Sequence, residues 1–324
     1  MATRRAIVLA TAATAVAVPA WSKLNYPDRT IIITAPVAPG GTVDIVARIL
    51  AEEFQKSMGQ PVAVNNKPGE GGAIGTRAAK REQPDGYNIL VTANSNHLIV
   101  PWVYKNPGFD PLQDFVPIAA VGVVPNLLCV NPTFPANDLE GFLKAVKNHP
   151  NEYRYASAGN GTLNHLLGVM LCQMTGLRLV HVPYNSVTSA QSDVIAGKVP
   201  MLFASLPSAH ETVIAGKLRA IGVSGHHRSR AMPAVPAIAE QVPGFGFTGD
   251  LWVAAYVPQG TPHTVVEAIR SAVSTAIASP HVRRRFEGLG IVALNDGPRE
   301  LAIRQEKEFQ VWRNIVKISG AKID

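Results

Sequence analysis

Cysteine is almost absent from this chain, which limits how the fold is held together. Its 324 residues include two cysteines, Cys129 and Cys172. Two cysteines are too few for a disulfide scaffold or a four-cysteine zinc site. Cys172 falls in a helical pattern and Cys129 in an apolar run, so two buried free thiols fit the sequence at least as well as one disulfide. The sequence leaves their pairing open.

Aromatic residues are also scarce, and charge of one sign is not concentrated. Aromatic side chains make up 6% of the chain, and 30 Lys and Arg against 23 Asp and Glu give a formal net charge of +7. Nucleic-acid binding needs basic side chains clustered on one face with aromatic residues between them. The densest basic runs, residues 226–230 and 283–285, are short and indicate solvated surface. We therefore predict no nucleic-acid partner, and the modest positive charge fits an anion-binding cleft.

Long apolar runs are missing beyond the N-terminus. There, Arg4 and Arg5 precede an uncharged stretch, residues 6–20, that is rich in Ala and Val, too short to span a bilayer and terminated by small residues. This pattern is typical of a cleavable signal peptide, which we assign to residues 1–22, with cleavage after Ala20 or Ser22. No cysteine follows that a lipid anchor would need. We expect a soluble mature protein in the periplasm.

Catalytic motifs are lacking too. The chain has no G-x-S-x-G elbow, no G-x-x-x-x-G-K-[ST] loop and no H-E-x-x-H motif. Two glycine-rich stretches approach the dinucleotide fingerprint, but Ile74 and Asn164 stand where its third glycine belongs. The adjacent His226 and His227 have no cysteine or carboxylate beside them for a metal site. We predict a protein that is not an enzyme and that uses no cofactor and no metal ion.

Two glycine-bearing stretches are the most informative feature that is present. Each lies between a β-like run and an amphipathic helical pattern, one with Gly40 and Gly41, the other with Gly159 and Gly161. Free N–H groups and the positive end of a helix dipole gather at such turns, which favours carboxylate or phosphate. Glycine has purely steric uses at such turns as well. Because two of these turns occur, we predict an anion that is held from both sides.

Strand-like and helical segments alternate along the whole chain. The apolar residues after each glycine turn recur at helical spacing, and Thr42 and Thr162 are the predicted N-caps of the two helices. Alternation predicts an α/β fold with parallel sheets that are covered by helices on both faces. The mature chain of about 300 residues is longer than a single hydrophobic core usually supports, which suggests two domains. In such sheets, ligands bind beyond the carboxyl ends of the strands, where both glycine turns lie.

Polar residues beside these turns allow more than one role. His165, just inside the second helix, is either a pH-sensitive cation beside the anion or a histidine that holds the turn. Asp44 would repel an anion, so we expect it to bind loop N–H groups, with recognition of a ligand ammonium as the alternative. Residues 94–97 and 184–186 supply neutral donors and acceptors at the same sheet edges.

Several further segments occur in an order that is specific to one family. They include Ala38-Pro-Gly-Gly-Thr-Val-Asp44, Asn66-Lys-Pro-Gly-Glu-Gly-Gly-Ala-Ile-Gly75, Pro84-Asp-Gly-Tyr87, Tyr155-Ala-Ser-Ala-Gly-Asn-Gly161 and Val257-Pro-Gln-Gly-Thr-Pro262. Through them the chain resembles the Bug family, the extracytoplasmic solute receptors of the tripartite tricarboxylate transporter system. The resemblance covers essentially the whole mature sequence.

The resemblance implies an α/β, two-lobed periplasmic-binding-protein fold of the Venus-flytrap, type II-like, kind, in which each lobe is a sheet flanked by helices. Lobe 1 would comprise residues 23–122 and 255–324, and lobe 2 residues 123–254, with hinge crossings near 123–130 and 250–257. The lobes would close on a small carboxylate, either an organic acid or an acidic amino acid. A monomer would deliver it to the membrane subunits of a tripartite tricarboxylate-type transporter.

Ligand contacts of the family map onto both lobes. In lobe 1 they fall on Ala38, Pro39, Gly40, Gly41, Thr42, Asn94, Ser95 and Asn96, to which we add Asp44. In lobe 2 they fall on Ser157, Ala158, Gly159, Asn160, Gly161, Thr162, Tyr184, Asn185, Ser186, Ala204 and Ser205, to which we add His165. Asn185 and Ser186 replace the family's usual Lys-Gly after the tyrosine, so the identity of the carboxylate stays open.

Two rival functions also fit the sequence. The first is an exported α/β enzyme that acts on a carboxylate with His165 beside Ser157 or Asp44, although the chain shows no nucleophile–base spacing with a third orienting group. The second is a ligand sensor that presents its closed form to a signalling partner. A transport receptor and a sensor have the same sequence signature.

Overall fold

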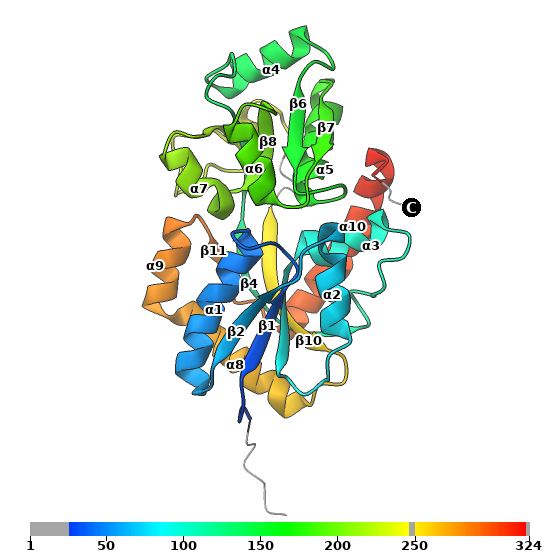
Figure 1. The fold of residues 1–324 in the computed structure, drawn as a ribbon, viewed down its shortest axis with the longest axis vertical. Helices are drawn as coiled ribbons and strands as arrows, with labels where there is room; N and C mark the ends of the chain where they lie inside the picture. Colours follow the sequence, from blue (N-terminus) through cyan, green and yellow to red (C-terminus); the bar gives the residue numbers. More distant parts are fainter. Residues whose placement is uncertain (1–25, 246–249, 322–324) are drawn as a thin grey trace, which may run out of the picture.

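Two β-sheets, each flanked by helices, give the molecule two lobes (Figure 1). The structure, a computed structural model, describes residues 26–245 and 250–321. The predicted signal peptide, residues 1–22, lies outside the described residues. The α/β class and the division into two sheets are as predicted from the sequence.

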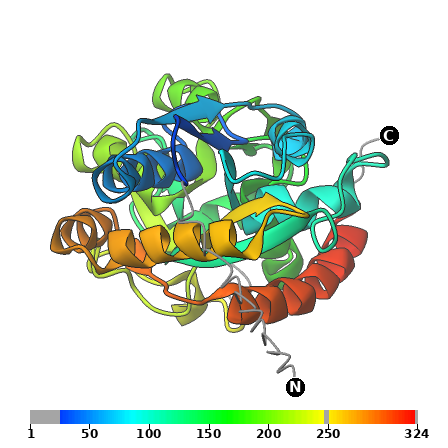
Figure 2. The same ribbon diagram turned by 90° about the horizontal axis from the view of Figure 1, so that it is seen from below.

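The first lobe is built on a six-stranded sheet with the order β11-β4-β10-β3-β1-β2. Its strands are β1 (Ile31–Ala35), β2 (Val62–Asn66), β3 (Asn88–Ala93), β4 (Phe115–Val124), β10 (Leu251–Pro258) and β11 (Val292–Ala293). Its helices are α1 (Thr42–Met58), α2 (Ala73–Lys80), α3 (Val100–Val103), α8 (His263–Ala278), α9 (Pro280–Gly288) and α10 (Pro298–Ser319), with short helical turns η1 (Glu70–Gly72) and η2 (Ser95–Ile99). Helices α8 and α10 both pack against β4, and the view from below shows them along one side of the lobe (Figure 2).

The second lobe is built on a five-stranded sheet with the order β7-β6-β8-β5-β9. Its strands are β5 (Asn126–Val130), β6 (Arg154–Ser157), β7 (Val180–Pro183), β8 (Met201–Ser205) and β9 (Arg219–Val223). Its helices are α4 (Leu139–Asn148), α5 (Leu163–Thr175), α6 (Val187–Ile195) and α7 (Leu206–Ile214), with a short turn η3 (Ile238–Glu240).

Both sheets are mixed, which corrects the prediction of parallel sheets. Strands β1, β2 and β3 are parallel, but β10 runs antiparallel to β3 and β4, and β5 runs antiparallel to β8 and β9. Apart from the two-residue β11, which runs antiparallel to β4, the antiparallel strand of each sheet is the one that follows a passage from the other lobe, so it enters its sheet from the opposite end. A local apolar pattern indicates that a strand is present, but it does not indicate in which direction the strand runs.

The chain passes between the sheets at two places. Strand β4 ends at Val124 and β5 begins at Asn126, so Pro125 alone separates the two sheets there. The return passage precedes Leu251, because all of β10 belongs to the six-stranded sheet. The lobe boundary expected between residues 254 and 255 therefore falls inside a strand, and the two expected crossing strands each lie within a single sheet.

A hydrophobic core fills each lobe without covalent cross-links. Helix α1 buries an apolar stripe that includes Val46, Leu50 and Phe54, and it ends at Gly59 in the left-handed conformation. Cys129 and Cys172 are both free, and Cys129 is completely buried. Within residues 26–245 and 250–321, no helix has the length and apolar character needed to cross a bilayer.

Candidate functional site

A cavity of about 90 Å³ lies between the two sheets, where loops from both lobes meet. It is smaller than the roughly 150 Å³ cavity that holds a benzene molecule in an engineered protein, so it suits a compact ligand. Its lining consists of Pro36, Val37, Ala38, Gly41, Thr42, Val43, Pro68, Gly69, Gly71, Gly72, Ser95, Asn96, Ala158, Thr162, Asn164, Asn185, Ser186, Val187, Ser205 and Leu251. None of these side chains is charged.

The lining includes about half of the predicted site residues. Those that line the cavity are Ala38, Gly41, Thr42, Ser95, Asn96, Ala158, Thr162, Asn185, Ser186 and Ser205. Those that the structure places outside the lining are Pro39, Gly40, Asp44, Asn94, Ser157, Gly159, Asn160, Gly161, His165, Tyr184 and Ala204. The predicted loops of both lobes thus border this cavity, but sequence spacing could not tell which residues of each loop line it.

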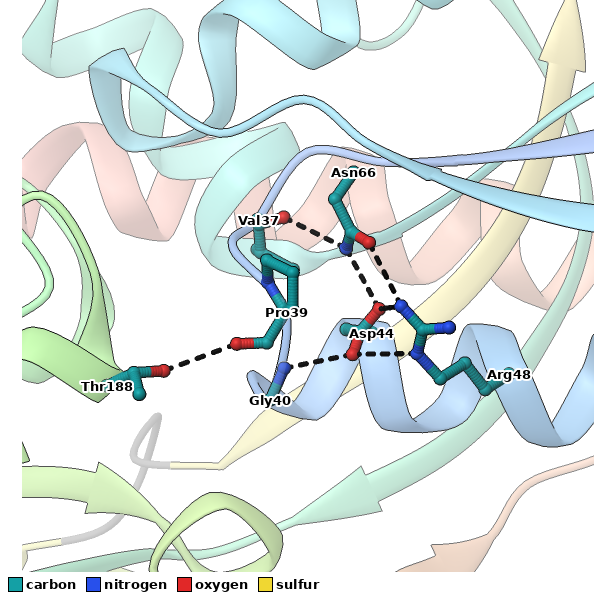
Figure 3. Close-up of polar contacts among 7 residues, drawn as sticks. All are labelled: Val37, Pro39, Gly40, Asp44, Arg48, Asn66 and Thr188. Atoms are coloured by element: carbon teal, nitrogen blue, oxygen red, sulfur yellow. Dashed lines mark hydrogen bonds and ion pairs between the residues drawn. The ribbon is translucent and has the colours of Figure 1, made fainter.

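Asp44 supports the β1–α1 loop, as Figure 3 shows. Its Oδ2 accepts hydrogen bonds from the Gly40 N–H at 2.9 Å and from Arg48 Nε at 3.1 Å, and its Oδ1 accepts one from Asn66 Nδ2 at 2.9 Å. Asn66 also donates to the Val37 carbonyl. Burial alone would raise the pKa of Asp44, but the hydrogen bonds from Arg48, Gly40 and Asn66 hold it below its ordinary value. These contacts correspond to the loop-support role, since both oxygens accept hydrogen bonds from the protein.

Thr42 does not cap α1, contrary to the prediction. The N-cap is Gly41, in extended backbone and with no capping side chain. The Thr42 hydroxyl instead lies 2.5 Å from the hydroxyl of Ser205, which belongs to the other lobe. A partner in the other lobe outcompetes the local cap here, and the α1 N–H groups nearest the cavity are left without a side-chain acceptor.

The β6–α5 turn is held by Thr162 and His165. Thr162 is the N-cap of α5, as predicted: its hydroxyl accepts from the His165 N–H and donates to the Gly159 carbonyl at 2.7 Å. His165 Nδ1 accepts from the Gly161 N–H at 3.0 Å, so this nitrogen is unprotonated. Burial lowers the pKa of His165 to about 4. His165 therefore holds the turn, and the interpretation as a pH-sensitive cation is wrong.

Ser157 pairs with a histidine that the sequence did not single out. Its hydroxyl lies 2.6 Å from His181 Nε2, and the His181 ring stacks on His165 with 3.9 Å between centroids. Burial, together with the neighbouring His165, lowers the pKa of His181 to about 3. Neither Ser157 nor His181 lines the cavity. Strands β6 and β7 are parallel neighbours in which Ser157 lies opposite Pro183, so the pair depends on strand order, for which the sequence has no local signal.

Four helices begin at the cavity wall, two of which the sequence did not predict as part of the site. Helix α1 begins at Thr42 and α5 follows its N-cap Thr162, while α6 and α7 follow the N-caps Ser186 and Ser205. All four residues line the cavity. The first N–H groups of a helix have no intrahelical acceptor, and its N-terminus carries a partial positive charge. Four helix N-termini thus border a cavity that is lined by no cationic side chain, an arrangement of the kind that favours anions.

Some lining residues were outside the predicted site. The loop after β2 contributes Pro68, Gly69, Gly71 and Gly72, and the Gly71 carbonyl accepts a hydrogen bond from Asn96 Nδ2 at 2.6 Å. The signal for this loop was its run of glycines directly after a strand. Asn164, also in the lining, donates to Asn126 Oδ1 at 3.1 Å.

The two lobes touch each other around the cavity. Besides the pair of hydroxyls at Thr42 and Ser205, the Thr188 hydroxyl donates to the Pro39 carbonyl at 3.3 Å, which Figure 3 shows. Gly161, with φ +72°, lies so close to Val103 that an added Cβ would be 2.3 Å from its Cγ2 atom. These contacts describe a closed arrangement. In the described part of the chain, no group of three or more His, Cys, Asp or Glu side chains could hold a metal ion.

Sequence comparison finds relatives along almost the whole chain. The family model described as "Tripartite tricarboxylate transporter family receptor" matches residues 46–320. A UPF0065 protein of Pseudomonas sp. (strain P51) is 35% identical over 90% of this chain and 86% of its own length. Protein BugT of Bordetella pertussis is 33% identical over 92% of both chains.

Solved structures of similar fold extend this result. The periplasmic binding protein BugD is 32% identical, with a TM-score of 0.87 over 92% of this chain and 99% of its own. Rpa4515 of R. palustris with adipate is 27% identical, with a TM-score of 0.88 over 91% of this chain and 99% of its own. MatC of Rhodopseudomonas palustris with bound malate is 28% identical, with a TM-score of 0.83 over 90% of this chain and 100% of its own. These neighbours share the periplasmic-binding-protein fold. The chain belongs to the receptor family of the tripartite tricarboxylate transporters, which includes the Bug proteins that its sequence resembles.

Proposed function

We propose that this protein captures a small carboxylate in the cavity between its lobes and delivers it unchanged to the membrane subunits of a tripartite tricarboxylate-type transporter. The observation that carries the proposal is the convergence of four helix N-termini on a cavity whose lining contains no charged side chain. Backbone N–H groups at helix N-termini favour carboxylate. A cavity of about 90 Å³ limits the ligand to a compact molecule.

Small dicarboxylates are the first candidates for the ligand. Two structural neighbours are described with malate and adipate bound. Helix α1 contributes its N-terminus from one lobe, and α5, α6 and α7 contribute theirs from the other. A molecule with a carboxylate at each end would satisfy both sides of the cavity, and closure would strengthen each charge-assisted hydrogen bond by removing water.

The ligand is bound by loops that are already in place. Asp44 holds the β1–α1 loop, and His165 holds the β6–α5 turn, in both cases through a backbone N–H. Binding then costs little ordering of these loops, and more of the interaction energy appears as affinity. Asp44 and His165 therefore serve the site without contacting the ligand.

Lobe motion and compartment belong to the same proposal. We place the hinge at Pro125 and at the passage before Leu251, between one lobe formed by residues 26–124 and 251–321 and another formed by residues 126–245. Residues 1–22 would direct export, so that the mature chain works as a monomer in the periplasm. The Ser157–His181 pair lies outside the cavity lining, which argues against catalysis on the bound acid.

A thermal-shift screen of the mature protein tests the proposal. The ligands are monocarboxylates, dicarboxylates, tricarboxylates, amino acids and aromatic acids. A ligand present at about 100 times its Kd adds roughly 2.7 kcal/mol to the free energy of unfolding, so the true ligand raises the melting temperature clearly. Mass spectrometry of the best ligand after incubation should then find it unchanged. The absence of any stabilising carboxylate, or conversion of the ligand, would contradict the proposal.

A further inference from the structure

A second and larger cavity, of about 790 Å³, lies apart from the carboxylate cavity and shares no lining residue with it. This volume is within the range of small-molecule sites, which often lie at domain interfaces. The lining residues are Val123, Val124, Pro125, Gly225, His226, His227, Arg228, Ser229, Arg230, Ala231, Asp250, Ile277, Arg283, Phe286, Glu287, Gly290, Ile291, Val292, Ala293, Leu294 and Asn295.

Both lobes build the walls of this cavity. The loop after β9 contributes residues 225–231, and the other lobe contributes the end of β4, helix α9 and the segment around β11. Figure 1 shows α9 and β11 beside β4. Pro125 and Asp250, which border the two passages between the sheets, also line it. A molecule in this cavity would therefore contact both lobes and the hinge.

Apolar side chains form much of the cavity wall. Val124, Phe286 and Ile291 are almost fully buried parts of the core that reach the cavity, and Val292 is 63% exposed beside them. Large exposed apolar side chains at a concave surface are typical of binding sites. The cavity therefore suits a ligand with an apolar body.

The rim carries two arginines that have no recorded partner. Arg230 comes from one lobe and Arg283 from the other, and among residues 26–245 and 250–321 the structure records no hydrogen bond or ion pair for either guanidinium. Arg228 differs, because Glu240 binds it through two hydrogen bonds of 2.7 and 2.8 Å.

Two acids also line the cavity, of which one is half-buried and the other exposed. Asp250 has its Oδ1 buried, and this atom lies 3.3 Å from the position that a Cβ on Gly225 would take. Glu287 is exposed on the rim. The two arginines thus share the lining with two carboxylates, and in the described part of the chain neither carboxylate forms a recorded ion pair with Arg230 or Arg283.

We propose that this cavity binds an organic anion with an apolar body. Its acidic group would lie between Arg230 and Arg283, and its body would pack on Phe286 and Ile291. The basic run 226–230 and the first arginine of the run 283–285, both of which the sequence indicates as solvated surface, line this one site. Guanidinium groups suit carboxylate, sulfonate and phosphate oxygens, because their donors are arranged as a fork.

Fluorescence titration with 8-anilinonaphthalene-1-sulfonate tests the site, since this probe combines an aromatic body with an anionic group. The folded mature protein should bind one equivalent with enhanced emission. The double variant Arg230→Ala/Arg283→Ala should bind about tenfold more weakly. Arg284→Ala is the matched control, because Arg284 is exposed on the same helix but does not line the cavity, and its affinity should stay within about twofold of the parent.

A second variant fills the cavity with a bulky side chain and leaves both arginines in place. Ala293→Trp places a large ring at an exposed lining position and should abolish probe binding. Melting curves must show that each variant is folded, because the emission of the probe also rises when it binds hydrophobic surface exposed in a partly unfolded protein. Absence of binding to the parent, or equal affinity in the parent, the double arginine variant and Ala293→Trp, would overturn the proposal.

Discussion

At position 44 a buried carboxylate serves an anion-binding loop without facing the anion. Its oxygens are satisfied by Gly40, Arg48 and Asn66, so the negative charge is neutralised on the side away from the cavity. His165 supports the β6–α5 turn in a similar way, because its Nδ1 accepts a hydrogen bond from the Gly161 N–H. The sequence predicted both loops, and it favoured loop support for Asp44. It could not identify Asn66 or His181 as partners, because these contacts depend on which strands are neighbours.

Asp44→Asn should destabilise the protein and weaken carboxylate binding. The substitution keeps the size of the side chain but replaces a charged acceptor by an amide, whose NH₂ group then faces the donors of Gly40 or Asn66. We expect a loss of about 1–3 kcal/mol in the free energy of unfolding, measured by urea denaturation. Glu267→Gln is the control, since Glu267 pairs with Arg270 at the surface and its loss should leave the denaturation midpoint nearly unchanged. Equal midpoints for Asp44→Asn and the parent would argue against loop support.

The stacked histidines should make stability depend on pH. Burial lowers the pKa of His165 to about 4 and that of His181 to about 3, from an ordinary value of 6.5. Between pH 6.5 and these values the unfolded chain binds protons that the folded chain does not, so the free energy of unfolding falls as the pH falls. His165→Gln keeps an acceptor for the Gly161 N–H but does not titrate. Its melting temperature should decline less steeply than that of the parent between pH 6.5 and 4, and parallel curves would refute this account.

At the scale of elements, the site depends on where helices begin. The predicted helices α1 and α5 follow glycine turns, whereas α6 and α7 follow Ser186 and Ser205 and carry no such signal. Strand β4 also escaped prediction, because Pro117 and Gly122 interrupt its apolar run, and β11 has only two residues. Local patterns thus predicted most elements. They could not predict strand direction or the convergence of four helices, which are set by packing over long sequence distances.

Gly161→Ala should impair binding by preventing closure. The new Cβ would lie 2.3 Å from Val103 Cγ2 across the cleft, in a residue with φ +72°. Gly176→Ala is a matched control, because Gly176 has φ +71° but no atom within 4 Å of the added Cβ. Both substitutions should cost about 1 kcal/mol of backbone strain. Calorimetry should show about tenfold weaker carboxylate binding for Gly161→Ala alone, since its closed state must also relieve a steric clash.

A compensating substitution makes this prediction sharper. Val103→Ala removes the two methyl groups nearest to the new Cβ but leaves the Cβ of residue 103 at 2.8 Å, so the pair Gly161→Ala/Val103→Ala should recover part of the lost affinity. If Gly161→Ala binds like the parent, or if Gly176→Ala is equally impaired, closure past Val103 does not control binding.

At the scale of the whole molecule, two sheets joined by short passages meet around one small cavity. Two polar pairs cross the cleft beside the cavity, Thr42 with Ser205 and Thr188 with the Pro39 carbonyl, while α5 also packs against α10 and Gly161 lies close to Val103. Weak direct contacts between lobes leave the ligand to supply much of the closing energy. No local pattern in the sequence indicates these two pairs, whose residues lie 163 and 149 positions apart. The two-lobed arrangement itself was predicted through the family resemblance.

The Thr42–Ser205 hydrogen bond should stabilise the closed form. Thr42→Val and Ser205→Ala each remove one hydroxyl and leave the other without its partner across the cleft. Each should weaken carboxylate binding about fivefold, which corresponds to about 1 kcal/mol. The double variant should be little worse than either single one, because the two substitutions remove the same bond. Additive losses would show that the two hydroxyls act separately.

Calorimetric titration of the mature protein with malate, succinate and adipate tests the central claim most directly. The account predicts one site per chain for at least one of these acids, with a Kd of about 10 µM or tighter, and a marked loss of affinity in Gly161→Ala but not in Gly176→Ala. No binding of any of the three at millimolar concentration, or equal affinity in the parent and Gly161→Ala, would contradict capture of a small dicarboxylate between the lobes.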